Sequence, residues 1–173
     1  NFKLANSLKK NFPIKYFGFS IYKYKEYEKI VKLNKKRLAF QIPSNLVNNE
    51  FQKIKKENTA VIFVRSVFLQ GLLLKKKFTN NLNLPLSLKK FLKRYIKILN
   101  QLNINPLELC LSHAFNLKYM DYLVLGFNSK SQLQDTINMV KKKKLIYKNK
   151  KILDFLSSYK NMKFSDPRLW KKI

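Results

Sequence analysis

One stretch of the chain, residues 60–74, reads AVIFVRSVFLQGLLL. It begins as a run of apolar and β-branched residues, which is typical of a strand that is buried on both faces of a parallel sheet. Arg65 and Ser66 interrupt the run, and Gln70 and Gly71 follow. In α/β folds, ligand contacts lie just beyond the carboxyl ends of such strands, so these polar residues are candidates for a binding site.

Three other segments share this plan of an apolar strand that ends in small or polar residues. They are residues 14–20 (IKYFGFS), residues 38–42 (LAFQI, closed by Pro43) and residues 121–126 (DYLVLG). The segments between these strands have helical periodicity. Repeated strand–helix units of this kind predict a parallel sheet with right-handed crossovers.

Amphipathic helices are predicted before, between and after the strands. They are a helix that ends at Pro13, residues 25–33, a short helix around Phe51 and Ile54, residues 87–99, a helix that Asn105 and Pro106 open, a helix from Ser129 to the lysines at 141–144, and a last helix near the C-terminus. Ser129 and Gln132 have the spacing of a capping box. The residues predicted to face inward are Tyr27, Ile30 and Val31 in the helix at 25–33 and Leu133, Ile137 and Val140 in the helix that Ser129 opens. The helix after Pro106 contains Leu107, Cys110 and Leu111, and the last helix contains Ile152, Phe155, Leu156 and Tyr159.

Composition describes a folded and strongly basic chain. Its 173 residues are enough for one domain, and 46% hydrophobic with 14% aromatic residues excludes a disordered chain. The formal net charge is +28, from 37 basic and 9 acidic residues. Such charge is one signature of nucleic-acid binding. However, the lysines are scattered, and only Arg37, Arg65, Arg94 and Arg168 are arginines, so a codon bias that enriches lysine, asparagine and isoleucine explains the charge without such a partner.

Cysteine usage and hydropathy indicate a cytoplasmic protein. Cys110 is the only cysteine, so a disulfide framework is excluded and a reducing compartment is expected. Cys110 lies in an apolar helical run, which favours a buried and inert thiol. No stretch is long enough to span a membrane, and the N-terminal residues lack the pattern of a signal peptide.

The number of strands leaves two architectures open, a four-stranded doubly wound sheet or half of a (β/α)8 barrel, which needs about 250 residues when complete. The strand ends distinguish them. YFGFS at residues 16–20, FQIPSN at 40–45, VRS with LQGLL at 64–73, and LGFNS with QL at 125–133 resemble the aldo-keto reductase family, as does NPLEL at 105–109. They are similar, in order, to the ends of that family's fifth to eighth strands. The resemblance implies that residues 1–173 form a single partial domain, the C-terminal half of the barrel.

For function, the resemblance implies an oxidoreductase that uses NADPH or NADH to reduce a small carbonyl substrate to an alcohol. In that family a tyrosine, a lysine, an aspartate and a histidine carry the catalysis, and all four lie on the first half of the barrel. We therefore expect no catalytic residue here, and the missing N-terminal half would be the chain's partner. His113 lies on a predicted outer helix, where a lone histidine is usually structural.

The same resemblance assigns candidate residues to three parts of the cofactor. Ser20 and Gln41 match the partners of the nicotinamide carboxamide, and Arg65 stands where the family often stacks an aromatic ring on the nicotinamide. A salt bridge at the barrel rim is the alternative role for Arg65. The loop along the pyrophosphate is matched by Ser66, Leu69 and Gly71. The residues that match the adenosine site, with its ribose and 2′-phosphate, are Gly126, Asn128, Ser129, Gln132 and Asp135.

Several alternatives remain open from the sequence. Ser129 and Gln132 also form a complete cap without any ligand. The family commonly has a basic residue near Asn128, which is missing here, so the choice between NADPH and NADH stays open. A different function is that of a basic, non-catalytic protein that binds nucleic acid or anionic membrane through its lysines. A third interpretation is a self-contained half-barrel that forms dimers.

Overall fold

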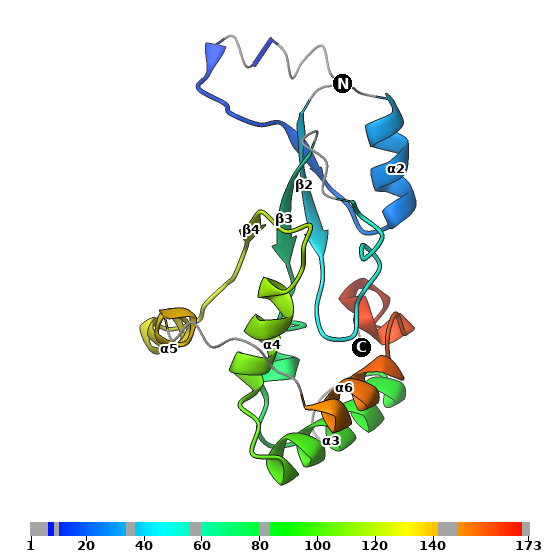
Figure 1. Cartoon of the computed structure of the whole chain (residues 1–173), viewed down its shortest axis with the longest axis vertical. Helices are drawn as coiled ribbons and strands as arrows, with labels where there is room; N and C mark the ends of the chain where they lie inside the picture. The colour runs from blue at the N-terminus through cyan, green and yellow to red at the C-terminus, as the bar shows by residue number, and fades with distance from the viewer. Residues whose placement is uncertain are drawn as a thin grey trace.

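A computed structural model describes residues 7–8, 11–33, 37–55, 60–79, 84–141 and 149–170. Strands and helices alternate along most of the chain (Figure 1). The strands are β1 (Gly18–Ser20), β2 (Leu38–Pro43), β3 (Ala60–Arg65) and β4 (Tyr122–Leu123). The α-helices are α2 (Tyr24–Leu33), α3 (Leu86–Gln101), α4 (Pro106–Phe115), α5 (Lys130–Lys141) and α6 (Lys150–Ser157), and the short 3-10 helices are η1 (Leu72–Leu74), η2 (Lys163–Ser165) and η3 (Pro167–Leu169).

The four strands form one parallel sheet in sequential order, β1-β2-β3-β4. Ser20 pairs with Gln41, Pro43 pairs with Arg65, and Val64 pairs with Leu123. The carboxyl ends of the strands therefore meet at one edge of the sheet. This arrangement confirms the predicted half-barrel of four parallel strands.

The two central strands carry the core. Phe40, Ile42, Val61, Ile62 and Val64 are buried on β2 and β3, because each of these strands is paired on both sides and covered on its faces. Helix α2 lies along β2, and α3, α4 and α6 gather beyond the carboxyl ends of the strands (Figure 1). There an aromatic cluster joins α3 and α6 to the C-terminal segment; its members are Phe91, Tyr95, Phe155, Tyr159 and Phe164.

The edge strands are shorter than the sequence predicts. Phe17 and Val124 were expected in strands, but β1 begins at Gly18 and β4 ends at Leu123. Both residues still take part in pairing, since Ala39 N–H donates to the Phe17 carbonyl and Val124 N–H donates to the Val64 carbonyl, each at 2.8 Å. An edge strand is paired on one side only, so its ladder ends sooner than that of a central strand.

The connection after β2 also differs from the expectation. The predicted short helix around Phe51 and Ile54 is absent from residues 44–55, which form turns, although both side chains are buried. Two asparagine side chains explain the difference. Asn45 Oδ1 accepts a hydrogen bond from Val47 N–H, and Asn48 Oδ1 accepts one from Glu50 N–H. Such local bonds satisfy backbone donors in a turn and so compete with helix formation.

Helix α5 does not bury the face that was predicted to be inward. Leu133, Ile137 and Val140 are 41%, 37% and 38% exposed, and Thr136 is the helix's buried residue. The helix projects to one side of the molecule (Figure 1). Its apolar periodicity is real, but the described chain covers this face only in part. Most of the predicted first helix, and the expected turns or helix ends at Asn58-Thr59, Asn80-Asn81 and 142–144, lie outside the described residues.

Both predicted helix starts that depend on side-chain caps are confirmed. Asn105 Oδ1 accepts hydrogen bonds from Leu107 N–H and Glu108 N–H, with Pro106 as the first helical residue. In the capping box of α5, Ser129 Oγ accepts from Gln132 N–H at 3.2 Å, and Gln132 Oε1 accepts from Asn128 N–H at 3.0 Å. These contacts fix where α4 and α5 begin.

Candidate functional site at the carboxyl edge of the sheet

Three of the predicted site residues meet at the ends of β1, β2 and β3. Ser20 Oγ lies 3.4 Å from Gln41 Oε1, and Arg65 Nη2 lies 3.5 Å from Ser20 Oγ. Arg65 Nη1 donates to Ser66 Oγ at 3.1 Å. Parallel pairing causes this meeting, since it brings equivalent strand ends to one edge. The group offers a hydroxyl, an amide and a guanidinium side by side.

The guanidinium of Arg65 is held by an aromatic ring. Its Cζ lies 4.4 Å from the ring centroid of Tyr22, and the Cζ of Arg168 lies 3.2 Å from the same centroid. Asp166 pairs with Arg168 at 2.7 Å, and this hydrogen-bonded guanidinium lowers the pKa of the Asp166 carboxyl. The tyrosine thus connects the end of β1 to the C-terminal segment through two stacked arginines.

These residues line a cavity of about 410 Å³, here called the Tyr22 cavity. It lies between the strand ends and the C-terminal segment. Its charged lining residues are Lys23, Glu50, Arg65, Lys163, Asp166 and Arg168, and its other walls include Tyr22, Ser66 and Gln70. The cavity therefore has several charged groups in its walls, and cations outnumber carboxylates among them.

A second cavity of about 630 Å³, the Gly71 cavity, lies between the loop after β3 and the loop after β4. It shares Ser66 and Gln70 with the Tyr22 cavity, so the two are neighbours across that loop. Lys75 is the charged residue in its lining. Of the predicted site residues it contains Ser66, Gly71, Gly126, Asn128 and Gln132.

The loop that separates the cavities has an unusual backbone. Ser66, Leu69, Gln70 and Gly71 have φ angles of 62°, 45°, 55° and 80°. Positive φ is rare for residues other than glycine and is concentrated at binding sites. At Gly71, an added Cβ would meet nothing within 4 Å, so its backbone faces open space. Leu69 is fully buried and lines neither cavity, so the structure does not place it at a ligand.

Five of the predicted residues line neither cavity: Ser20, Gln41, Leu69, Ser129 and Asp135. Ser129 is occupied by the cap of α5, and Asp135 is exposed on that helix.

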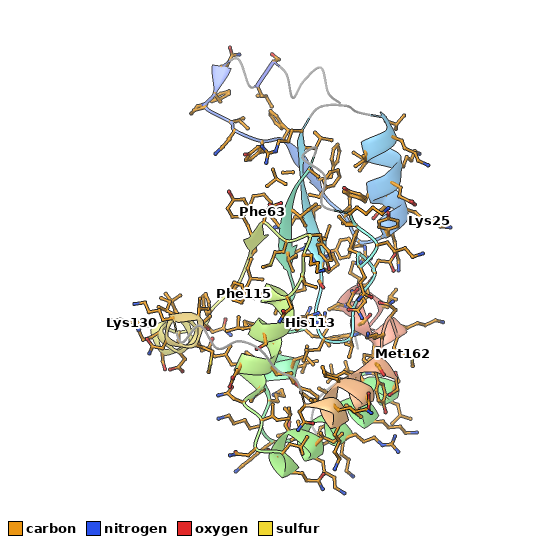
Figure 2. The ribbon with its side chains drawn as sticks, viewed as in Figure 1. Lys25, Phe63, His113, Phe115, Lys130 and Met162 are labelled. Atoms are coloured by element: carbon orange, nitrogen blue, oxygen red, sulfur yellow. The ribbon has the colours of Figure 1, made fainter. Side chains whose placement is uncertain are left out.

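His113 lies on α4, as expected, well apart from Phe63 of β3 (Figure 2). It lines a different cavity, with Ser112 and Lys160. Burial and the nearby Lys160 lower the pKa of His113 to about 4, although a hydrogen bond that the imidazole donates to the backbone of Asn45 opposes the shift. Burial likewise raises the pKa of the Cys110 thiol, so Cys110 is inert.

Among the lining residues that sequence reasoning missed are Tyr22, Lys75 and Arg168. Lys75 follows β3 closely, and the position after a strand end is the signal that could have found it. Tyr22 follows Ser20 in the same way. Arg168 lies 103 positions after Arg65 in the numbering, and only the folded C-terminal segment brings both onto one ring.

Other kinds of site are not found in the described residues. They contain no group of three or more histidine, cysteine, aspartate or glutamate side chains that could hold a metal ion. Within the same ranges, no helix is long and apolar enough to cross a membrane. The two joined cavities are therefore the main candidates for ligand binding.

The fold and these cavities define a (β/α)-barrel fragment with a candidate ligand site at the carboxyl ends of its strands. A model of the aldo/keto reductase family matches residues 3–156, and the chain belongs to that family. No curated protein matches the chain. Among solved structures, aldo-keto reductase AKR11C1 from Bacillus halodurans is similar in its holo form, with a TM-score of 0.64 at 15% identity, and in its apo form, with 0.63 at 16%. Each alignment covers 90% of this chain and 54% of the other, so the chain spans about half the length of these structures.

Proposed function

We propose that this chain supplies the cofactor-binding half of an NAD(P)H-dependent reductase that converts a carbonyl group to an alcohol. The family supports an oxidoreductase. The observation that carries the cofactor assignment is the pair of adjoining cavities at the strand ends, which share Ser66 and Gln70. A dinucleotide is long and has two different ends, so it fits a divided cleft better than a single pocket.

The residues at the ends of β1 and β2 fit the nicotinamide end of the cofactor. A carboxamide has one acceptor oxygen and an NH₂ donor, so it requires neutral partners of both kinds. The Ser20 hydroxyl and the Gln41 amide provide them and lie 3.4 Å apart. Arg65 is adjacent to Ser20, where its plane can pack beside the nicotinamide ring.

The Gly71 cavity fits the pyrophosphate and adenosine end. The space beside Gly71 and Gly126 is open, because a Cβ added to either residue would meet nothing within 4 Å. Such positions allow phosphate groups to approach main-chain N–H groups closely. Lys75 adds a positive charge, and the lining contains no carboxylate. Asn128 and Gln132 stand at the start of α5, the positive end of a helix dipole. Ser129 and Asp135 are assigned to the ribose and 2′-phosphate by resemblance alone.

When bound, the cofactor supplies the hydride for the reduction. The residues of this chain bind and orient it, but reduction also needs a proton donor within hydrogen-bond reach of the carbonyl oxygen. Tyr22 and Lys23 line one cavity, whereas His113, the chain's one histidine, lines another. Within the described residues, the two cavities at the strand ends therefore contain no histidine that could act beside Tyr22 and Lys23. We propose that the donor comes from an N-terminal half of the barrel, which would be this chain's partner.

The glycines provide a direct test of cofactor binding. The chain has three, and their amide signals occupy a separate region of a ¹H–¹⁵N NMR spectrum. Titration with NADPH should move the signals of Gly71 and Gly126 in a saturable way. Gly18 packs against Ala39 outside both cavities and is the internal reference. Unmoved Gly71 and Gly126 signals at millimolar NADPH would refute the assignment, and a parallel titration with NADH would establish the preferred cofactor.

A further inference from the structure

Arg65 is a positive charge without an acidic partner. Its Nη atoms contact the hydroxyl oxygens of Ser66 at 3.1 Å and Ser20 at 3.5 Å, and no carboxylate of the described residues forms an ion pair with it. A guanidinium has five N–H donors, so most of its donors remain available. The partner that best suits them is an oxyanion held by two parallel hydrogen bonds.

The walls of the Tyr22 cavity have an excess of positive charge. Lys23, Arg65, Lys163 and Arg168 line it together with two carboxylates, Glu50 and Asp166. Glu50 lies 3.8 Å from Lys23, and Asp166 lies 2.7 Å from Arg168. Both carboxylates are therefore matched to a cation, and within the described chain Arg65 and Lys163 are left uncompensated. This imbalance is local to the cavity, in addition to the basic composition of the whole chain.

The arrangement is rigid before any ligand arrives. The Tyr22 ring contacts both guanidinium groups, with the Cζ of Arg65 at 4.4 Å and the Cζ of Arg168 at 3.2 Å from its centroid. The C-terminal wall is fixed by two hydrogen bonds of 2.7 Å, from Asn161 N–H to the Val47 carbonyl and from Asn49 N–H to Asn161 Oδ1. Trp170 Nε1 donates to the Phe164 carbonyl at 2.9 Å. A fixed guanidinium binds an anion with less loss of conformational entropy than a mobile one.

We propose that the Tyr22 cavity binds an oxyanion group of the substrate through Arg65, so that the reductase prefers carbonyl compounds that carry a carboxylate or a phosphate. This inference rests on the proposed function, because Arg65 adjoins Ser20 and Gln41, the residues assigned to the nicotinamide. The anion would place the reacting carbonyl near the cofactor's reactive end. Lys163 would add attraction from the opposite wall.

The test is an NMR titration of this chain with acetate and with inorganic phosphate at constant ionic strength, with no cofactor present. Acetamide, the neutral counterpart of acetate, is the ligand control. The variants are Arg65→Gln, which removes the charge, and Arg65→Lys, which keeps the charge but loses the fork. Arg37→Gln is the matched protein control, because Arg37 also lies over a tyrosine, Tyr16 at 5.6 Å, at the opposite end of the sheet. Thermal unfolding verifies that each variant is folded.

The inference predicts saturable shifts of the Ser66 and Lys163 amide signals with at least one anion and none with acetamide. Affinity should fall roughly tenfold in Arg65→Gln, the scale for losing charge-assisted hydrogen bonds, less in Arg65→Lys, and not at all in Arg37→Gln. The anion that binds more tightly identifies a carboxylate or a phosphate substrate.

Three results would overturn the inference: no saturable shift, equal shifts with acetamide, or unchanged binding in a folded Arg65→Gln. Displacement of the anion by ADP-ribose would assign Arg65 to the cofactor's pyrophosphate and would also overturn it. The NADPH titration shows separately whether the cofactor assignment fails. Intact anion binding with unmoved Gly71 and Gly126 signals in NADPH would leave an anion site but reject a reductase substrate.

Discussion

Gln41 lies within β2, and its side chain reaches Ser20 on the neighbouring strand. We predict that Gln41→Leu weakens NADPH binding by about 1–2 kcal/mol, because a neutral hydrogen bond to the carboxamide is lost while the side chain keeps a similar size. ADP-ribose lacks the nicotinamide, so its affinity should not change. Calorimetric titration of both ligands checks this, and an equal loss for both would place Gln41 elsewhere in the cofactor site.

His113 gives a second prediction at the scale of one residue. Its pKa falls from the ordinary 6.5 to about 4 in the folded chain, mainly because it is buried. The unfolded chain therefore binds a proton below pH 6.5 that the folded chain rejects, so stability is lost as pH falls from 6.5 towards 4. The loss should reach at most about 3 kcal/mol.

Urea unfolding at several pH values measures this loss. His113 is the one histidine, so the interval from pH 6.5 to 5 reports mainly on it. In His113→Gln the free energy of unfolding should be nearly constant over that interval. Glu26 and Asp166 also have lowered pKa values, and their contributions disappear at more acidic pH. A wild-type chain whose stability does not change between pH 6.5 and 5 would contradict the burial of a neutral imidazole.

At the scale of an element, the position of β1 depends on Gly18. A Cβ on this residue would overlap the carbonyl of Ala39 on β2, so the two backbones approach too closely for any larger residue. Gly18→Ala should therefore push β1 away from β2 and destabilise the chain by roughly 1–3 kcal/mol, the cost of overpacking. Gly126→Ala is the control, since its Cβ would enter open space. Equal unfolding free energies for the two variants would show that β1 can shift without cost.

The elements also show what sequence reasoning could and could not find. Caps such as Asn105 and the Ser129–Gln132 pair act over a few residues, so their patterns located α4 and α5 correctly. The strands β2 and β3 were found from their continuous apolar runs. The turns at Asn45 and Asn48 were missed because their side chains compete with a helix that the apolar spacing favours. The assignment of Phe17 and Val124 to strands was wrong, because the number of paired residues in an edge strand depends on its single neighbouring strand.

The candidate site divides in the same way. The sequence predicts the meeting of Ser20, Gln41 and Arg65, because parallel pairing brings successive strand ends together. The stacking of Arg65 and Arg168 on Tyr22 was not predictable, because it depends on how the C-terminal segment returns to the sheet. Likewise, periodicity identified the apolar face of α5 but not whether anything covers it.

At the scale of the whole molecule, the chain has one sheet edge with two cavities and about half the length of the related structures. We propose that this unit binds the cofactor but does not supply the proton for reduction. The exposed residues Leu133, Ile137 and Val140 on α5 add a practical condition, because apolar surface of this kind promotes association. Activity must therefore be measured on a monomeric preparation.

NADPH oxidation by the purified chain with a broad panel of aldehydes tests whether this half of the barrel lacks a proton donor. We expect no turnover above the background rate, even where NMR shows bound NADPH, because the cavities of the described residues at the strand ends contain no histidine beside Tyr22 and Lys23. Turnover above background by a well-behaved monomer would contradict the account and show that this chain already contains a complete active site.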